Sequence, residues 1–159
     1  MPYLPDNQSA SQDSEVLSAT VTVGRIMSRR PVTVSMDDTL AKAQALFAEF
    51  HFHHLLVVEG RRLVGVISDR DVLKASSPFT GTLNETDRDA ATLHKRIHQI
   101  MSRRLITVDS GTCIRTATEL LIEKGVSCLP VVTEDGTAEG IISWRDLLKA
   151  YLNFFPTSR

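Results

Sequence analysis

Residues 26–34 read IMSRRPVTV, and residues 100–108 read IMSRRLITV. A second pair of similar stretches follows, GVISDRDVLKA at 65–75 and GIISWRDLLKA at 140–150. The two copies align without a gap except for one extra residue in the last turn of the second copy. The aligned pairs contain 13 identities in 33 before that turn and 8 in 11 after it, where average residue usage would give roughly 3 in all. The chain is therefore an internal duplication, which has to be recognised before a fold is assigned.

Both copies predict the same order of elements, β-α-β-β-α. Apolar residues at helical spacing predict the first helix of each copy, with Asp38 and Thr112 as its N-caps and Gly125 as a left-handed stop in the second copy. The last helix of each copy is expected to begin at Ser68 or Ser143. The expected strands are Val32–Val34, His54–Val58 and Leu63–Ile67 in the first copy, and Ile106–Val108, Cys128–Val132 and Glu139–Ser143 in the second.

A copy of about 50 residues buries little surface alone. We therefore expect an α+β fold, an α/β sandwich, in which two repeats pack by their sheets with the helices outside and share one core. The expected organisation is a disordered tail at 1–19, a first repeat at 20–75, a linker at 76–92, a second repeat at 93–152 and a tail at 153–159.

Within this plan, residues 75–89 are expected to form an exposed loop and residues 90–99 a helix that leads into the second repeat. The apolar stretch 150–155 is expected to cap the core or to form a subunit contact.

Composition excludes several classes of protein. The formal net charge is −1, which gives no bulk attraction to nucleic acid or anionic lipid. No apolar run approaches the roughly 20 residues that cross a bilayer, and residues 1–19 do not have the pattern of a secretory signal. Two cysteines, Cys113 and Cys128, are too few for a disulfide framework or a four-cysteine zinc site. These features predict a protein of the reducing cytoplasm.

The segments Ser68-Asp69-Arg70-Asp71 and Ser143-Trp144-Arg145-Asp146 carry the strongest chemical signal. Each follows a strand and opens a helix, so a structural interpretation is a capping box between its Ser and its last Asp. A functional interpretation is a ribose-phosphate site: the helix amides, Ser and Arg suit a phosphate, and a carboxylate suits the ribose hydroxyls. The two interpretations are compatible because one Asp has two oxygens. The duplication favours function.

The repeats, their G-h-h-S-x-x-D endings (h, hydrophobic) and their IMSRR…TV openings resemble a tandem pair of CBS (cystathionine β-synthase) domains. The resemblance covers about 26–75 and 98–150. It implies two repeats about a pseudo-twofold axis, with two clefts that bind AMP, ADP, ATP or S-adenosylmethionine. It also implies that the protein is a module that regulates a partner protein. It further implies that the protein forms a homodimer.

The resemblance also implies which residues line each cleft. Each cleft takes its ribose and phosphate contacts from one repeat and its adenine contacts from the other. The first cleft would use Asp71, Ser68, Arg70 and His54, with Met101, Ile106 and Val126 around the base. The second would use Asp146, Ser143, Arg145 and Cys128, with Met27, Val32 and Phe52 around the base. Because His54 can donate to a phosphate and Cys128 is a weak donor, we expect the Asp71 cleft to prefer phosphorylated ligands.

The paired arginines before each first strand, Arg29-Arg30 and Arg103-Arg104, are either solvated turns or contacts to a polyphosphate. His51, His53 and His54 invite a metal interpretation. However, His51 is expected to end a helix and the other two to point to opposite faces of a strand, so no metal site is predicted. Trp144 replaces Asp69 in the second copy and is a surface residue, a cleft wall or a dimer contact.

The sequence therefore favours a ligand-binding regulatory module without enzymatic activity or a catalytic cofactor. The alternatives are a nucleotide-acting enzyme such as a phosphohydrolase, and a nucleic-acid-binding protein. A phosphohydrolase needs a metal-binding acid cluster or an activated nucleophile, and the sequence contains no motif for either. The net charge argues against nucleic acid as the main ligand.

Overall fold

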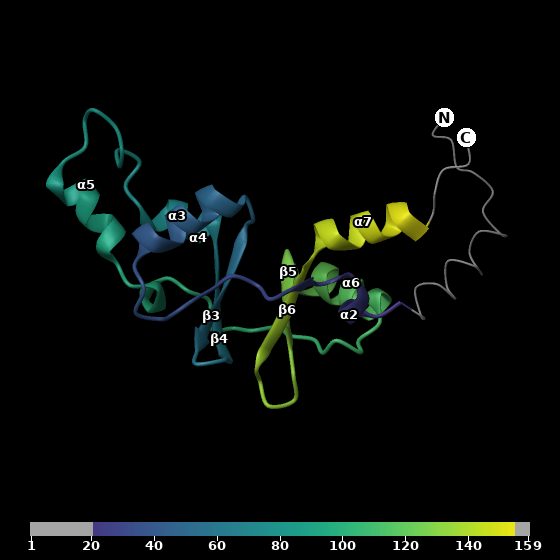
Figure 1. Cartoon of the computed structure of the whole chain (residues 1–159). Helices are drawn as coiled ribbons and strands as arrows, with labels where there is room; N and C mark the ends of the chain where they lie inside the picture. Colours follow the sequence, from purple (N-terminus) through teal and green to yellow (C-terminus); the bar gives the residue numbers. More distant parts are fainter. Residues whose placement is uncertain (1–20, 155–159) are drawn as a thin grey trace, which may run out of the picture.

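The structure, a computed structural model, describes residues 21–154. The helices and strands follow the predicted duplication, with the two halves side by side (Figure 1). The first half contains α2 (Val23–Ile26), β1 (Ser28–Arg29), β2 (Thr33–Val34), α3 (Leu40–Phe50), β3 (His54–Glu59), β4 (Arg62–Ser68) and α4 (Asp69–Ala75). The second contains α6 (Ile114–Lys124), β5 (Cys128–Val132), β6 (Ala138–Ser143) and α7 (Trp144–Phe154).

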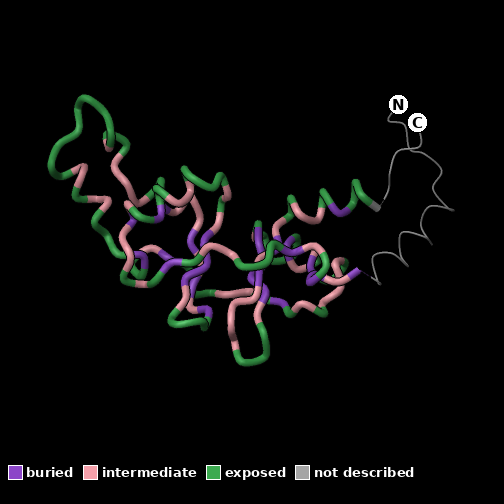
Figure 2. The backbone as a smooth tube through the Cα atoms, viewed as in Figure 1, coloured by how far each residue is buried: buried purple, intermediate pink, exposed green. Residues whose placement is uncertain are grey.

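Two three-stranded sheets form the centre of the molecule, in the orders β2-β3-β4 and β1-β6-β5. An antiparallel hairpin, β3 with β4 or β5 with β6, is the main part of each sheet. The strand predicted at Ile106–Val108 is wrong, because of these residues only Val108 makes a bridge, parallel to Val131. In the first repeat, the equivalent strand β2 pairs with β3 over two residues. The predicted α+β sandwich of two repeats is otherwise confirmed. The buried segments of both halves follow these central strands (Figure 2).

The two repeats exchange their opening segments. Ser28 and Arg29 pair with Ile141 and Gly140 of the second repeat, and Ser102 bridges Val66 of the first. The structure therefore has two buried clusters instead of the single shared core that we expected, and each contains a segment from the other repeat. Val23 and Met27 pack in the second cluster, and Ile97 and Met101 pack in the first.

This exchange explains why a glycine opens the GxIS stretch of each repeat. A Cβ added at Gly65 would lie 2.6 Å from the Met101 sulfur, and one added at Gly140 would lie 2.6 Å from the Met27 sulfur. The methionine of each IMSRR segment thus occupies the space beside the glycine of the opposite repeat. Neither half is structurally complete without the other.

Helix starts differ from the prediction by one residue. The predicted N-caps Asp38 and Thr112 are wrong, because Thr39 and Cys113 occupy these positions. Thr39 accepts from the amide of Lys42, whereas Asp38 instead accepts from the Ser35 amide and from Lys42 Nζ. The predicted stop at Gly125 is confirmed by its left-handed φ of 62°.

The connector is exposed at residues 78–79 and 81–88 and half-buried at 75–77 and 80. The single helix predicted at 90–99 is wrong. A short helix α5 (Asp87–Ala91) is followed by two 3₁₀ turns, η1 (Thr92–His94) and η2 (Ile97–Gln99). The helix starts early because Thr86 and Asp89 form a capping box. The 3₁₀ turn η1 that follows it ends at Lys95, whose ψ of 144° is not helical.

The remaining predictions concern the ends of the chain. The apolar stretch from Ala150 continues α7, in which Ala150 is buried while Tyr151 and Leu152 are exposed. Phe155 and the tail predicted at 1–19 lie outside the described residues. Within residues 21–154, no helix is long and apolar enough to cross a membrane.

Candidate functional site

Both Ser-x-x-Asp segments form the predicted N-terminal caps. The Ser68 amide and hydroxyl both donate to Asp71 Oδ2, at 2.9 and 2.6 Å. The Ser143 amide and hydroxyl donate to Asp146 Oδ2 in the same way, at 2.8 and 2.7 Å. Since each cap uses Oδ2, Oδ1 of either Asp has no hydrogen-bond partner among residues 21–154. The structural role therefore leaves one carboxylate oxygen for a ligand, as predicted from the sequence.

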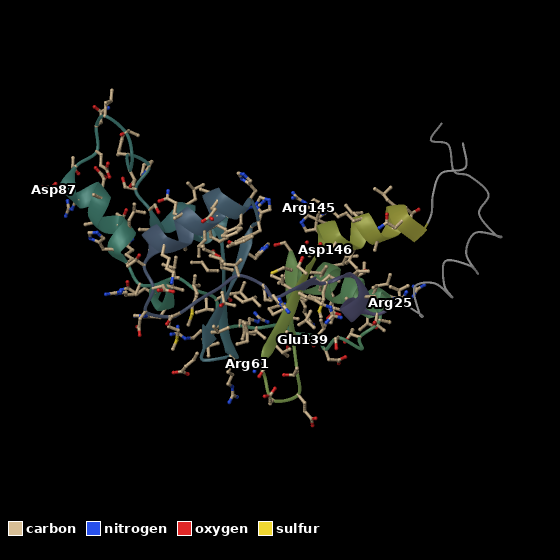
Figure 3. All side chains as sticks on the ribbon, in the orientation of Figure 1. Arg25, Arg61, Asp87, Glu139, Arg145 and Asp146 are labelled. Atoms are coloured by element: carbon tan, nitrogen blue, oxygen red, sulfur yellow. The ribbon has the colours of Figure 1, made fainter. Side chains whose placement is uncertain are left out.

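These two caps open into one cleft of about 680 Å³. In Figure 3, Arg145 and Asp146 lie at the first turn of α7, on the side toward the first half. Residues 28–32 and 51–54 of the first repeat complete the walls, and Ser127 and Ile141 contribute from the second. The cleft therefore lies between the repeats and combines residues from both.

Nine of the fourteen predicted ligand residues line this cleft. The first set contributes Ser68, Arg70, Asp71 and His54, and the second contributes Ser143, Arg145, Asp146, Val32 and Phe52. The other five do not line it: Met101, Ile106, Val126, Met27 and Cys128. The structure thus joins the polar residues of both sets in one cleft, whereas the apolar residues come from the second set alone.

The charge of the cleft differs from that of the whole chain. Its basic side chains outnumber its acidic ones by five to three, histidines aside, although the chain carries a formal charge of −1. The bases are Arg29, Arg30, Arg70, Lys74 and Arg145, and the acids are Asp69, Asp71 and Asp146. Sequence reasoning did not include Lys74, which follows Asp71 by one helical turn and could have been found from that spacing. The balance favours an anionic ligand.

Histidines occupy the first repeat's side of the cleft. His53 Nδ1 lies 2.7 Å from Asp69 Oδ2, and His54 Nε2 lies 2.9 Å from Ser127 Oγ, which links the two repeats. Burial lowers the pKa of His54, against the opposing effect of the Asp69 and Asp71 carboxylates, so the imidazole is neutral at pH 7. Burial raises the pKa of Asp69, but hydrogen bonds from His53 and the Arg70 amide outweigh it, and the net pKa of Asp69 is lowered.

At the positions of His53 and His54, the second repeat has Ser127 and Cys128. Burial raises the pKa of the Cys128 thiol to about 12, so this side chain stays protonated and apolar. His51 ends α3 as predicted, in a left-handed conformation with a φ of 56°. Within the described part of the chain, no three His, Cys, Asp or Glu side chains are placed to hold a metal ion.

The paired arginines divide into two structural types. The first arginine of each pair donates to the carbonyl five residues earlier, Arg29 to Gly24 at 2.7 Å and Arg103 to His98 at 3.2 Å. The second arginines, Arg30 and Arg104, have no polar side-chain partner among residues 21–154. Of these two, Arg30 lines the cleft and Arg104 does not.

Comparison with known proteins agrees with the duplication. The model of the CBS domain family matches twice, at residues 23–78 and 97–153. The chain belongs to the CBS domain family. A CBS domain-containing protein of Dictyostelium discoideum is 32% identical over 130 residues, which cover 80% of this chain and 89% of the relative.

Solved CBS pairs share this fold. The crystal structure of CBSX2 in complex with AMP is 30% identical, with a TM-score of 0.70 over 83% of this chain and 96% of that one. The CBS domain pair of protein MJ0100, in complex with 5′-methylthioadenosine and S-adenosyl-L-methionine, has a TM-score of 0.70 over 84% of this chain and 97% of that one. At 23% identity, the second likeness shows the fold alone.

Proposed function

We propose that this CBS pair is a regulatory module that binds an adenosine-containing ligand, AMP, ADP, ATP or S-adenosylmethionine, between its repeats. The main support for the proposal is that both Ser-x-Arg-Asp segments line the same basic cleft. The AMP complex of a relative that is 30% identical supports it.

Each part of such a ligand has a matching surface in the cleft. The unpartnered Oδ1 of Asp146 accepts from the ribose hydroxyls, which a carboxylate can bind as a pair. The Arg145 guanidinium, in the first turn of α7, contacts the phosphate. Phe52 and Val32 provide an apolar wall for the adenine, and Phe52 already stacks on Phe50 with ring centroids 5.7 Å apart.

Ligand binding regulates by fixing the orientation of the repeats. The His54–Ser127 hydrogen bond crosses the cleft between them, so a ligand that contacts both repeats stabilises one arrangement, which a partner protein reads. The module forms a homodimer in the reducing cytoplasm. Leu73 and Leu148, at corresponding positions of α4 and α7, are both exposed and available for the dimer contact, and both cysteines are free.

Calorimetry on the full chain with AMP, ADP, ATP and S-adenosylmethionine tests the ligand proposal. We expect saturable binding of at least one of them, with no product after prolonged incubation with ATP. ATP turnover would favour the phosphohydrolase alternative. If none of the four ligands binds and duplex DNA or RNA does, the regulatory-module proposal is wrong. Sedimentation of the wild type and Leu148→Glu tests the homodimer, which the charge should dissociate.

A further inference from the structure

Two residues of the cleft adopt a backbone conformation that side chains disfavour. Arg30 has a φ of 53° and His51 a φ of 56°, and they are the two non-glycine residues with positive φ in the described part of the chain. Left-handed conformations are costly for residues with a Cβ, and at functional sites such strain persists where the side chain is needed. Both of these residues line the cleft.

The duplication supplies a control for each position. The counterpart of His51 is Gly125, which ends α6 at nearly the same φ, 62°, without a side-chain penalty. The counterpart of Arg30 is Arg104, which has no positive φ and does not line the cleft. Both left-handed residues that carry side chains therefore line this cleft, whereas neither of their counterparts, Gly125 and Arg104, lines it.

Neither side chain has a structural task that accounts for its position. Arg30 makes no polar side-chain contact among residues 21–154, unlike Arg29, which is held by Gly24 and by Glu139. The ring of His51 likewise has no hydrogen-bond partner there, and the helix stop needs only its backbone amide, which donates to Phe47. Both side chains are exposed and free to take a ligand.

We infer that Arg30 and His51 form a subsite for the phosphates beyond the first one of a nucleoside di- or triphosphate, which makes the cleft selective for phosphate number. This inference rests on the proposed nucleotide function. The planar guanidinium suits a terminal phosphate, and an imidazole nitrogen can donate to the same group. Neither side chain is required for the adenosine part of the ligand, so AMP affinity should not depend on them.

The test measures binding of AMP, ADP, ATP and inorganic tripolyphosphate to the full chain by calorimetry. Fluorescence of Trp144, the single tryptophan of the chain and a cleft residue, gives a second signal. Arg30→Gly and His51→Gly should each weaken ADP and ATP by about tenfold and leave AMP within twofold. Arg104→Ala, the matched control, should change none of these affinities.

The melting temperature of the variants distinguishes a ligand-binding role of Arg30 and His51 from a role in packing. Because glycine removes the strain, Arg30→Gly and His51→Gly should raise the Tm by about 2 °C while they lower ADP affinity. A side chain that merely packed would show a lower Tm and an unchanged ratio of ADP to AMP affinity.

The outcomes also separate this inference from the proposed function. If the wild type binds AMP but the variants keep its ratio of ADP to AMP affinity, the subsite is wrong and the module stands. If the wild type binds tripolyphosphate but no adenosine compound, and Arg30→Gly weakens that binding, the subsite stands and the adenosyl proposal is wrong. If the wild type binds neither ADP nor tripolyphosphate, the subsite is overturned.

Discussion

The two repeats have the same Ser, Arg and Asp in their helix caps and differ in the residues that surround those caps in the cleft. The Ser68 and Ser143 amides and hydroxyls donate to Oδ2 of Asp71 and Asp146 at distances that agree within about 0.1 Å, and in the first repeat the Asp71 amide also donates to the Ser68 hydroxyl, at 3.2 Å. Around them, the first repeat has the His53–Asp69 pair, whereas the second has Ser127 and Trp144 at the same positions. The Ser, Arg and Asp of each cap are the same in both repeats, whereas the residues beside them in the cleft differ.

This difference makes the cleft asymmetric in charge as well as in shape. The Asp69 carboxylate on the first side is ionised and paired with His53, while the second side has the Trp144 ring with the Arg145 guanidinium 5.9 Å from its centre. The apolar residues Val32 and Phe52 belong to the set predicted for the Asp146 side, and both line the cleft. The two sides are therefore expected to respond differently to equivalent substitutions.

The largest expected difference is in stability, between the two glycines that face the exchanged segments. At Gly140 a new Cβ would lie 2.9 Å from the Ser28 carbonyl oxygen, which is backbone, as well as 2.6 Å from the Met27 sulfur. At Gly65 the nearest backbone atom is 3.3 Å away, and the close contact is with the flexible Met101 side chain. We expect Gly140→Ala to lower the free energy of unfolding by about 3 kcal/mol and Gly65→Ala by about 1 kcal/mol.

Urea denaturation of both variants measures this difference, with Gly60→Ala as a reference. Gly60 has open space around it and a left-handed φ of 61°, so its substitution reports backbone strain alone. Equal losses at Gly65 and Gly140 would show that the two halves accommodate the exchange equally.

The next effect concerns ligand affinity. Because the apolar wall of the cleft belongs to the Asp146 set, Asp146→Asn should weaken AMP binding by about 2 kcal/mol, near 30-fold, through the loss of charged hydrogen bonds to the ribose. Asp71→Asn should cost less than half of that free energy. Asn keeps an oxygen acceptor for the cap, so folding is preserved.

Calorimetry with AMP measures the loss of affinity in each variant. The contrast between His54 and Cys128 alone predicts the opposite order, in which Asp71→Asn weakens AMP binding more than Asp146→Asn. A larger loss for Asp71→Asn would restore the sequence-based order. Equal losses would remove the asymmetry altogether. Asp135→Asn, in an exposed turn outside the cleft, is the control.

A smaller effect should appear in the pH dependence of stability. The folded state lowers the pKa of His54 below its unfolded value of 6.5, so the unfolded chain binds more protons at mildly acidic pH. The contribution to stability is therefore complete above pH 6.5 and is lost as the pH falls below it, with a slope of at most about 1.4 kcal/mol per pH unit. Cys128 stands at the equivalent position and cannot take part.

Thermal unfolding between pH 7.5 and 5 follows this loss, and His54→Gln should flatten the profile in that range. The lowered pKa of Asp69 acts in a separate window, since its stabilisation is present above about pH 4 and lost below it. A His54→Gln profile that still falls between pH 6.5 and 5 would assign the titration to another histidine.

Much of this asymmetry could be predicted from the sequence, because alignment of the repeats exposes each substitution. The capping boxes and the strands of each hairpin follow from spacing and residue type, and the duplication makes them unambiguous. The exchange of opening segments could not be predicted, since the alignment is the same whether IMSRR packs on its own repeat or on the other. The pairing of β1 with β6 and the contacts of Met27 with Gly140 and of Met101 with Gly65 distinguish these packings.

The site could be predicted in its residue types more than in its geometry. The repeated Ser-x-Arg-Asp pattern identifies the Ser, Arg and Asp residues. Whether the polar residues predicted for the two clefts line a single cleft depends on how the repeats lie relative to each other, which the pattern does not specify. The left-handed backbone of Arg30 could not be predicted from the residues before it, because its copy Arg104 has the same preceding neighbours and no positive φ. The residue after the arginine differs, since Pro31 follows Arg30 and Leu105 follows Arg104.

The smallest predicted effect concerns the two arginines that repeat the same hydrogen bond. Arg29 and Arg103 each donate to a carbonyl five residues earlier, but Arg29 also lies 3.6 Å from Glu139 and belongs to the exchanged strand β1. Arg29→Ala should therefore lower the free energy of unfolding by about 1 kcal/mol and Arg103→Ala by about 0.5 kcal/mol, since both side chains are exposed. Raising the salt concentration should weaken only the Arg29–Glu139 ion pair. In urea titrations at 1 M NaCl, the two variants should therefore lose about the same free energy of unfolding. Convergence would assign the extra stability of the first repeat's arginine to Glu139, whereas a difference that persists in salt would assign it to the hydrogen bond with the Gly24 carbonyl.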